Sequence, residues 1–363
     1  MATQAPATTK AWRVTGYDGF ESLKCNEEPT PPVGDDEVLV KTSAPSNNIL
    51  MSNQFRDLII PMGKYPFPQK ANVVPGSDGS GIVVSVGKNV TRFQEGDKVI
   101  TILNQRHLAG SIDSSALNSG LGGSVDGTMR SFGVFDQQGL VKMPDGLTFL
   151  EAATLTCAGV TAWNALFGQP GRELMSGQWL LTQGTGGVSL FALQFAKSIG
   201  AKVISITSSA EKADLLHRLG ADHVINYLET PEWGEQAKAL TGGIGVDLVV
   251  EVVGAATLKQ SVSSLKLDAT VSVVGFAGGD AEGSQVPNLL DPWLKHYTVR
   301  GISVGSRLQM EAMCRAVGAN FAQLRPIIDP TVFKLEEARE AYEYLQAGKN
   351  LGKVCIDASY RLP

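Results

Sequence analysis

A glycine-rich segment, Gln183-Gly-Thr-Gly-Gly-Val-Ser189, carries the strongest chemical signal in the sequence. It follows a short apolar run that is typical of a strand and it opens a helical pattern, which is the context of a dinucleotide-binding turn. Gly184 allows the tight turn, Gly186 lets the backbone approach a pyrophosphate, and the helix starting near Gly187 offers free N–H groups to phosphates. The cofactor contacts expected here are Gly184, Thr185, Gly186, Gly187 and Val188. A tight turn that binds no ligand is the alternative.

The end of the next strand indicates which dinucleotide binds. An NAD enzyme usually has an acidic residue there to hold the ribose 2′-OH, whereas this chain has Thr207-Ser208-Ser209, followed by Lys212. A carboxylate would repel a 2′-phosphate, while hydroxyls and an ammonium would bind it. Ser208, Ser209 and Lys212 therefore predict NADP(H). The alternative is that a serine only caps a helix and that Lys212 is solvated, and both interpretations can hold at once.

The elements that must position this turn alternate between strands and helices. Strand-like runs occur at residues 179–182, 202–206, 223–226, 246–250 and 270–274. Helical patterns lie between them, for example at 189–199 and 210–219. Alternating strands and helices predict a parallel, doubly wound sheet in an α/β fold.

The remainder of the chain has a different pattern of predicted strands and helices. The first third is β-like, with short β-branched runs at 38–42, 81–86 and 98–102 that are bounded by Gly, Pro and Asp turns. Residues 107–127 are rich in Gly, Ser and Asp, so we expect a surface loop there. After residue 300 we expect two helices, at 308–319 and 335–345, and a final strand at 353–356 that returns to the first domain.

Composition indicates a globular chain with two domains, because 363 residues exceed one ordinary core. The formal charge of −5 argues against a nucleic-acid or anionic-membrane binder, and no segment is apolar and long enough to span a bilayer. Residues 1–10 lack the apolar segment of a secretory signal and are typical of a short leader, with a weak targeting tail as the alternative. Four widely spaced cysteines predict free thiols, and we expect a cytoplasmic protein.

Motifs along the chain resemble zinc-independent medium-chain dehydrogenases/reductases, the quinone-oxidoreductase-like and zinc-type-alcohol-dehydrogenase-like branch of that superfamily. They occur in family order: Pro75-Gly-Ser-Asp-Gly-Ser-Gly-Ile-Val, Phe93-Gln-Glu-Gly-Asp-Lys-Val, Cys157-Ala-Gly-Val-Thr-Ala-Trp, the glycine-rich turn, Lys212 through Leu219-Gly-Ala-Asp-His, Val304-Gly-Ser-Arg307 and Gly352-Lys353-Val. The resemblance implies a GroES-like β-barrel catalytic domain, 1–158 and 304–363, with a Rossmann cofactor domain, 159–303, inserted into it. The active cleft would lie at their junction, and we expect a homodimer.

The same resemblance implies further cofactor contacts. Thr161 would approach the nicotinamide, and the backbone around Val304 would border it. Three residues would line the cofactor groove: Val253, Gly275 and Phe276. Three would lie near the adenosine or phosphate portions: Tyr227, Arg307 and Lys353.

The zinc ligands of the zinc-dependent relatives are missing. A catalytic zinc needs about three ligands from Cys, His and carboxylates, and the relatives supply a Cys, a His-Glu pair and a second Cys. Here residues 44–57 contain no Cys or His, the pair reads Ser77-Asp78, and only Cys157 remains. The closely spaced cysteines of a structural zinc are also absent between residues 100 and 132. We therefore expect no metal, and we interpret Cys157 as a small buried apolar side chain behind the nicotinamide.

The segment 45–52 departs from the relatives, in which the early strand runs directly into an Asn-Tyr-Arg-Asp-like turn. Here it intervenes before Asn53-Gln-Phe-Arg-Asp57. The pocket asparagine of the relatives can therefore correspond to Asn48, Asn53 or Gln54.

Without a Lewis acid, reduction of a simple carbonyl lacks its usual oxyanion stabiliser, whereas an enone or quinone spreads the charge and needs one donor. The candidate donors are Tyr65, in Gly63-Lys-Tyr-Pro, and the amide near Asn53. The alternative for Tyr65 is an ordinary half-buried aromatic. We predict NADPH-dependent hydride transfer to an enone, quinone or similar small molecule. The alternatives are a metal-free alcohol/carbonyl oxidoreductase that uses a side-chain acid, and a non-catalytic NADPH-binding structural or RNA-associated protein, which the acidic charge disfavours.

Overall fold

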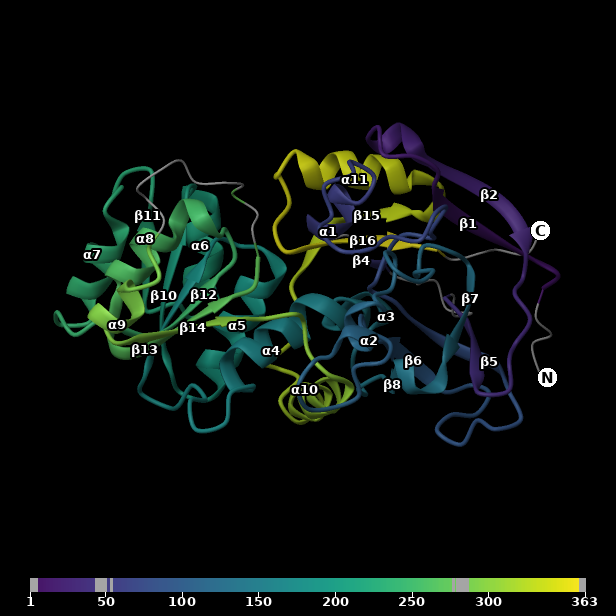
Figure 1. Cartoon of the computed structure of the whole chain (residues 1–363), viewed down its shortest axis with the longest axis horizontal. Coiled ribbons are helices and arrows are strands. Elements are labelled where there is room, and N and C mark those ends of the chain that lie inside the picture. Colours follow the sequence, from purple (N-terminus) through teal and green to yellow (C-terminus); the bar gives the residue numbers. More distant parts are fainter. Residues whose placement is uncertain (1–5, 43–50, 53–54, 276–277, 279–286, 359–363) are drawn as a thin grey trace. The chain divides into compact units, whose positions relative to one another are not determined.

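The computed structural model describes residues 6–42, 51–52, 55–275, 278 and 287–358. The chain divides into two compact units (Figure 1). Unit 1 comprises Met1–Cys157, Gly305–Phe321 and Arg325–Pro363, and unit 2 comprises Ala158–Val304 and Ala322–Leu324. In the part of the chain that is described, no helix has the length and apolar character needed to cross a membrane.

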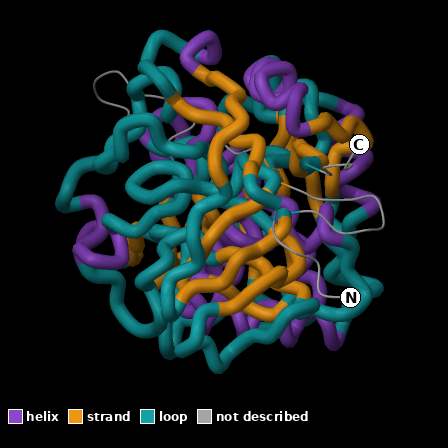
Figure 2. The backbone as a smooth tube through the Cα atoms, turned by 90° about the vertical axis from the view of Figure 1, so that its right-hand side faces the viewer, coloured by secondary structure: helices purple, strands orange, loops and turns teal. Residues whose placement is uncertain are grey.

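The described residues of unit 1 form three small sheets, and in Figure 2 its strands cross among long loops. The five-stranded antiparallel sheet has the order β7 (Phe132–Asp136), β3 (Glu37–Lys41), β5 (Ser80–Val86), β6 (Lys98–Thr101) and β8 (Leu140–Lys142). A hairpin pairs β1 (Thr8–Val14) with β2 (Leu23–Pro29), and the third sheet has the order β15 (Ile328–Lys334), β16 (Lys353–Asp357) and β4 (Met51–Ser52). Its helices are α1 (Phe55–Ile59), α2 (Ser114–Leu117), α3 (Phe149–Ala153), α10 (Arg307–Ala319) and α11 (Ala338–Gln346).

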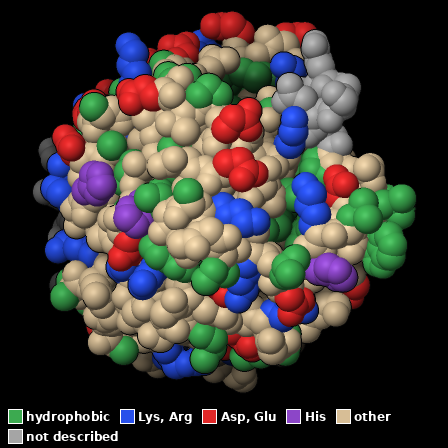
Figure 3. Space-filling model, turned by 90° about the vertical axis from the view of Figure 1, so that its left-hand side faces the viewer, with side chains coloured by type: hydrophobic (Ala, Val, Ile, Leu, Met, Phe, Trp, Pro, Cys, Tyr) green, Lys and Arg blue, Asp and Glu red, His purple; other side chains and the backbone are tan. Residues whose placement is uncertain are grey.

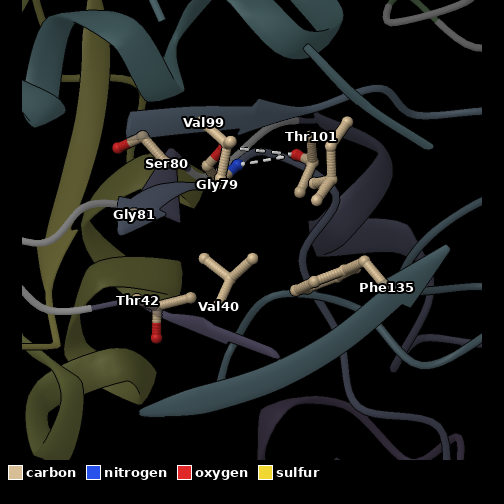
Figure 4. A pocket seen from close by; sticks show the side chains of 9 residues that line it. Val40, Thr42, Gly79, Ser80, Gly81, Val99, Thr101 and Phe135 are labelled. Atoms are coloured by element: carbon tan, nitrogen blue, oxygen red, sulfur yellow. Dashed lines mark hydrogen bonds between the residues drawn. The ribbon is translucent and has the colours of Figure 1, made fainter. Parts of the chain in front are cut away.

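The alternation of side chains along β3 builds two cores from one strand, since successive residues of a strand point to opposite faces. Val38 and Val40 join one buried cluster, whereas Leu39 joins another. Beside Val40 lies a small cavity, whose lining includes Phe135 and Thr101 (Figure 4). None of the nine described residues around this cavity is charged, so we place the candidate chemistry elsewhere.

Another core cluster of unit 1 joins the two ends of the chain. Trp12 and Val14, from β1, pack in the same buried cluster as Tyr342 of α11 and Ile356 of β16. The indole N–H of Trp12 also donates to the carbonyl of Leu335 at 2.7 Å. The final strand thus completes a core that the first strand begins.

The segment 107–127, expected to be a surface loop, is partly an interior segment. Leu121 is 1 % exposed, and Gly122 lies at φ 70° with its N–H bonded to the Val125 carbonyl. At Gly127 an added Cβ would lie 1.9 Å from the Gly76 carbonyl oxygen. Glycines occupy these positions because two backbone segments pass in close contact. The prediction that this whole stretch lies on the surface was therefore wrong.

Unit 2 is a six-stranded parallel sheet, as the alternating pattern predicted. Its order is β11 (His223–Asn226), β10 (Lys202–Thr207), β9 (Trp179–Gln183), β12 (Val246–Glu251), β13 (Leu265–Val273) and β14 (Tyr297–Gly301). The order reverses direction at β9, which is the doubly wound arrangement whose switch point binds dinucleotides. The predicted α/β fold class, with a parallel, doubly wound sheet beside a β-rich part, is confirmed.

Helices cover both faces of this sheet (Figure 1). They are α4 (Val160–Phe167), α5 (Gly187–Ser198), α6 (Ala210–Arg218), α7 (Trp233–Leu240), α8 (Ala255–Ser263) and α9 (Asp291–Leu294). Right-handed crossovers that leave the switch point in opposite directions place α5 and α8 on opposite faces. The strands between them are almost fully buried, with Leu181, Val249 and Val271 at 0 % exposure.

Candidate functional site: a dinucleotide turn and a buried charged cluster

The glycine-rich turn has the geometry expected of a phosphate-binding turn. Gly184 lies at φ 71°, in the left-handed region that favours glycine, and its N–H donates to the Ile206 carbonyl at 2.7 Å. A Cβ added at Gly184 or Gly186 would have no atom within 4 Å, so the outer side of the turn is open. Gly186 is the N-cap of α5 and makes no side-chain cap, which leaves the first N–H groups of the helix to a ligand.

Ser189, in place of the third glycine, is buried and its hydroxyl donates to the Gln183 carbonyl at 2.6 Å. This bond ties the first turn of α5 to the end of β9. The serine therefore keeps helix and strand in close contact, as a glycine would, and adds one hydrogen bond.

A buried carboxylate behind the turn holds the neighbouring strand ends together. Glu251, at the end of β12, is 0 % exposed. Its carboxylate accepts hydrogen bonds from the Gln183 side-chain amide at 2.8 Å and from the Gly254 N–H at 2.9 Å. Further donors to it are the Val253 N–H, Thr257 Oγ1 and Ser261 Oγ. The Gln183 amide oxygen in turn accepts from the N–H groups of Val252 and Val253.

This network brings several sequence-predicted residues to one edge of the sheet. Val253 lies two residues after β12, and a Cβ at Gly275, just after β13, would lie 2.6 Å from the Val252 carbonyl oxygen. The turn after β12 thus lies between Gln183 and Gly275. Phe276 lies outside the described residues.

The residues that are predicted to bind the 2′-phosphate lie at the end of β10. Ser208, Ser209 and Lys212 are all partly exposed there, and the Ser209 hydroxyl accepts from the Lys212 N–H at 3.2 Å as the N-cap of α6. The capping alternative is therefore realised for Ser209. The predicted contacts of Ser208 and Lys212 with a 2′-phosphate stay predictions. Tyr227 is 40 % exposed and its N–H donates to the Thr207 carbonyl at 3.0 Å, beside this edge.

Val304 is held in an unusual backbone conformation within unit 2. Its φ is 56°, which is rare for a β-branched residue and costs on the order of 1–3 kcal/mol. The Asn164 side chain donates to the Val304 carbonyl at 2.7 Å, and Arg300 donates to Asn164 Oδ1 at 2.7 Å. Thr161, in the first turn of α4, is 4 % exposed on the same helix as Asn164.

Two buried ion pairs lie in unit 1, around the positions where zinc ligands were sought. The Lys353 ammonium is 3.2 Å from Asp78 Oδ2, and the Arg56 guanidinium is 3.2 Å from Asp57 Oδ1. Both aspartates are 0 % exposed. Arg56 also contacts Tyr65, through Nε at 3.5 Å from the hydroxyl and with the guanidinium carbon 5.1 Å from the ring centroid. The candidate donor Tyr65 is therefore partly buried beside a fixed positive charge.

Lys353 was predicted to lie near the adenosine or phosphate portions, and this contact stays a prediction. Lys353 is 5 % exposed, and its ammonium is bonded to Asp78 inside unit 1. A buried carboxylate needs a cation, and Lys353 supplies it. Arg307 likewise lies at the start of α10 in unit 1, where its guanidinium contacts Gln138 and Glu311, so its predicted phosphate contact stays a prediction.

The charged cluster does not fit zinc. The pKa of the Cys157 thiol is raised to about 12, mainly by burial and also by Asp78, although Lys353 and Arg56 lower it. Zinc binds the thiolate, which is scarce at neutral pH for such a group. The Asp78 carboxylate is held by Lys353 and accepts from Ser77 Oγ at 3.0 Å. Over the described ranges, no three His, Cys, Asp or Glu side chains are grouped to hold a metal ion.

Sequence reasoning did not identify Arg56 or the pairing of Asp78 with Lys353. A signal for the first existed, because Arg56-Asp57 directly precedes the apolar run Leu58-Ile59-Ile60, which places two charges at the border of a buried segment. The second pair joins residues 275 positions apart, which no local pattern reveals. The alternatives Asn48, Asn53 and Gln54 lie outside the described residues.

Comparisons with known proteins agree with this architecture. Residues 34–145 match the model of the alcohol dehydrogenase GroES-like domain, and residues 187–319 match that of the zinc-binding dehydrogenases. A zinc-type alcohol dehydrogenase-like protein of Schizosaccharomyces pombe is 40% identical over 340 residues, which cover 93% of this chain and 96% of the relative. The match covers nearly the whole of both chains, so the likeness extends to both units.

Two solved structures are also similar. An NAD-dependent alcohol dehydrogenase is 26% identical with a TM-score of 0.83, covering 96% of this chain and 100% of that one. A quinone oxidoreductase of Pseudomonas syringae pv. tomato DC3000 is 26% identical with a TM-score of 0.79, covering 96% and 99%. The chain belongs to the medium-chain dehydrogenase/reductase superfamily of nicotinamide-dependent oxidoreductases, in its zinc-type alcohol dehydrogenase-like branch.

Proposed function

We propose that the protein is an NADPH-dependent reductase that transfers a hydride to an enone, a quinone or a similar activated double bond, without zinc. The observation that carries the proposal is the buried cluster of Arg56–Asp57 and Asp78–Lys353 beside Tyr65. It provides a guanidinium and a phenol but a poor set of zinc ligands. Hydride addition to a conjugated system spreads the charge, so hydrogen-bond donors can take the place of a Lewis acid.

The chain's own residues bind and orient the reactants. When bound, NADPH supplies the hydride. The open turn at Gly184 and Gly186 would hold the pyrophosphate, and the fixed backbone of Val304 would border the nicotinamide. Tyr65 accepts a hydrogen bond from Arg56 Nε, so its own hydroxyl hydrogen stays available to donate to the acceptor's oxygen.

Cofactor choice gives the first test. Lys212→Ala should weaken NADPH binding by roughly 10- to 150-fold and leave NADH nearly unchanged, because one charge-assisted contact to the 2′-phosphate contributes about 1.5–3 kcal/mol. Fluorescence titration of both cofactors measures this. Lys238→Ala is the matched control, since Lys238 is equally half-buried on α7. Equal losses for NADPH and NADH would show that Lys212 does not bind the phosphate.

The position of the transferred hydride tests the reaction. NADPH that carries deuterium at the nicotinamide C4 is incubated with the protein, a chelator and a simple enone, and a quinone is tested in parallel. We expect turnover in the chelator and deuterium on the carbon β to the carbonyl. Deuterium on the carbonyl carbon would instead support the metal-free alcohol/carbonyl oxidoreductase. Binding of NADPH without turnover of any acceptor would support the non-catalytic alternative.

The surface of unit 2 bears on the partners we propose, a small-molecule substrate and a second copy of the chain. The face shown in Figure 3 intersperses basic and acidic side chains, with no continuous basic area for a nucleic acid. β14 is the edge strand of the sheet, and exposed apolar side chains lie on it, before it and on the adjacent β13: Leu267, Leu289, Leu290, Trp293, Leu294 and Val299. An apolar sheet edge of this kind suits the contact of a homodimer.

A further inference from the structure

Arg56 is a nearly buried guanidinium with an unused hydrogen-bond donor. Only 11 % of its side-chain surface is exposed. Nη1 donates to Asp57 and Nε to the Tyr65 hydroxyl, but across the described part of the chain Nη2 has no acceptor. A buried donor without a partner costs about 1–3 kcal/mol. An oxygen of a bound ligand would recover that cost.

The surroundings keep Arg56 charged. Burial alone lowers its pKa, but the nearby Tyr65 and Asp57 raise it, and the net shift is upward. Its charge in turn lowers the pKa of Cys157 and of Asp78, so the guanidinium lies among the residues that correspond to the relatives' zinc ligands. A permanent positive charge therefore occupies this region without a metal.

Gly123 lies close to the guanidinium, on the side of the unused donor. A Cβ added there would lie 3.0 Å from Arg56 Nη2 and 3.4 Å from Tyr65 Cε1. Even a methyl group at residue 123 would therefore crowd both the unused donor and the ring. A glycine at this position keeps bulk away from the place where a ligand oxygen would approach Nη2.

We propose that Arg56 binds the oxygen of the electron acceptor and stabilises the negative charge that develops on it. This inference rests on the proposed function. Hydride from NADPH forms a C–H bond at the β-carbon, the C=C electron pair moves to form the enolate, and its oxygen is bound by Nη2. A proton from water then adds to the α-carbon, so the acceptor is reduced by two electrons and NADPH is oxidised to NADP⁺.

The binding test uses 4-nitrophenol as a stable analogue of the enolate, titrated spectroscopically with the protein saturated with NADP⁺. An adjacent fixed cation lowers the pKa of a bound acid by roughly 1–3 units. The wild type should show such a shift, Arg56→Lys should keep part of it, and Arg56→Met should abolish it. Gly123→Ala should weaken dye binding while Arg56 remains, because the added methyl crowds Nη2. An unchanged dye pKa in Arg56→Met overturns the inference.

Matched controls separate this role from a structural one. Arg130→Met removes another buried guanidinium of unit 1, which lies 5.2 Å from the Phe135 ring, and should leave the dye pKa unchanged. Tyr65→Phe retains the cation and should retain most of the shift. In turnover, Arg56→Met should lower kcat by about 10²-fold or more, with partial recovery in Arg56→Lys. If the wild type reduces no enone or quinone, the proposed function fails, but the dye titration still decides whether Arg56 binds an oxyanion.

Discussion

Replacing Lys353 by methionine should lower the free energy of unfolding of unit 1 by about 3–5 kcal/mol, because it leaves the Asp78 carboxylate buried without its cation. Methionine has a similar length and fills the same space, so the loss reports the charge more than the packing. Urea denaturation followed by the fluorescence of Trp12, a core residue of unit 1, measures it. A loss below about 1 kcal/mol would show that other groups satisfy Asp78.

Two further measurements test the cause of that loss. The double variant Asp78→Asn/Lys353→Met removes both charges and should be more stable than Lys353→Met alone. Burial already raises the pKa of Asp78, although Lys353, Ser77 and Arg56 lower it, and losing Lys353 raises it further. A carboxyl group whose pKa is higher in the folded state than in the unfolded state lowers the free energy of unfolding. This loss is present at pH values above the unfolded-state pKa of about 3.9. The deficit of Lys353→Met should therefore shrink as the pH falls toward that value.

Glu251→Ala should destabilise unit 2 by at least about 3 kcal/mol and weaken NADPH binding roughly tenfold or more. The substitution leaves the N–H groups of Val253 and Gly254 and the Gln183 amide without their shared acceptor. The glycine-rich turn and the turn after β12 then lose the group that joins them. The urea midpoint of unit 2 and the NADPH dissociation constant measure the two effects.

Ser261→Ala is the matched control for this network. It removes one donor to Glu251 and one acceptor of the Gln183 amide, but the bond from Gln183 to Glu251 stays. It should therefore cost about 1 kcal/mol and hardly change NADPH affinity. If Glu251→Ala binds NADPH as the wild type does, the network supports the fold but does not position the cofactor turn.

The sequence predicted those parts of the molecule that depend on neighbouring residues. The strand, tight turn and helix around Gly184 have a local pattern, as do the capping serine and the strands of unit 2. β15 was not expected, because Ile328-Asp-Pro-Thr-Val-Phe-Lys334 contains a proline and mixes charged with apolar residues. For β14 the sequence indicated only a strand start near His296, since Tyr297-Thr-Val-Arg-Gly301 is short and carries an arginine.

The charged cluster of unit 1 could not be predicted in the same way, because its members meet only through the fold. Asp78 lies in the irregular segment before β5 and Lys353 opens β16, near the other end of the chain. The family resemblance gave Lys353 a phosphate contact, which stays a prediction. Its pairing with the buried Asp78 is visible only in the fold. Similarly, the glycines near residue 122 indicated a loop, whereas they serve a close contact between buried backbones.

The core that joins Trp12 to Tyr342 and Ile356 also has a consequence for synthesis on the ribosome. Domains generally fold as units while the chain emerges at about 5–20 residues per second. Unit 2 is nearly complete once Val304 has emerged, whereas unit 1 must wait for β16, which ends at Asp357. At that speed the interval is roughly 3–10 s. The second unit in the sequence is therefore expected to fold first, while the apolar strands of the first remain available to chaperones.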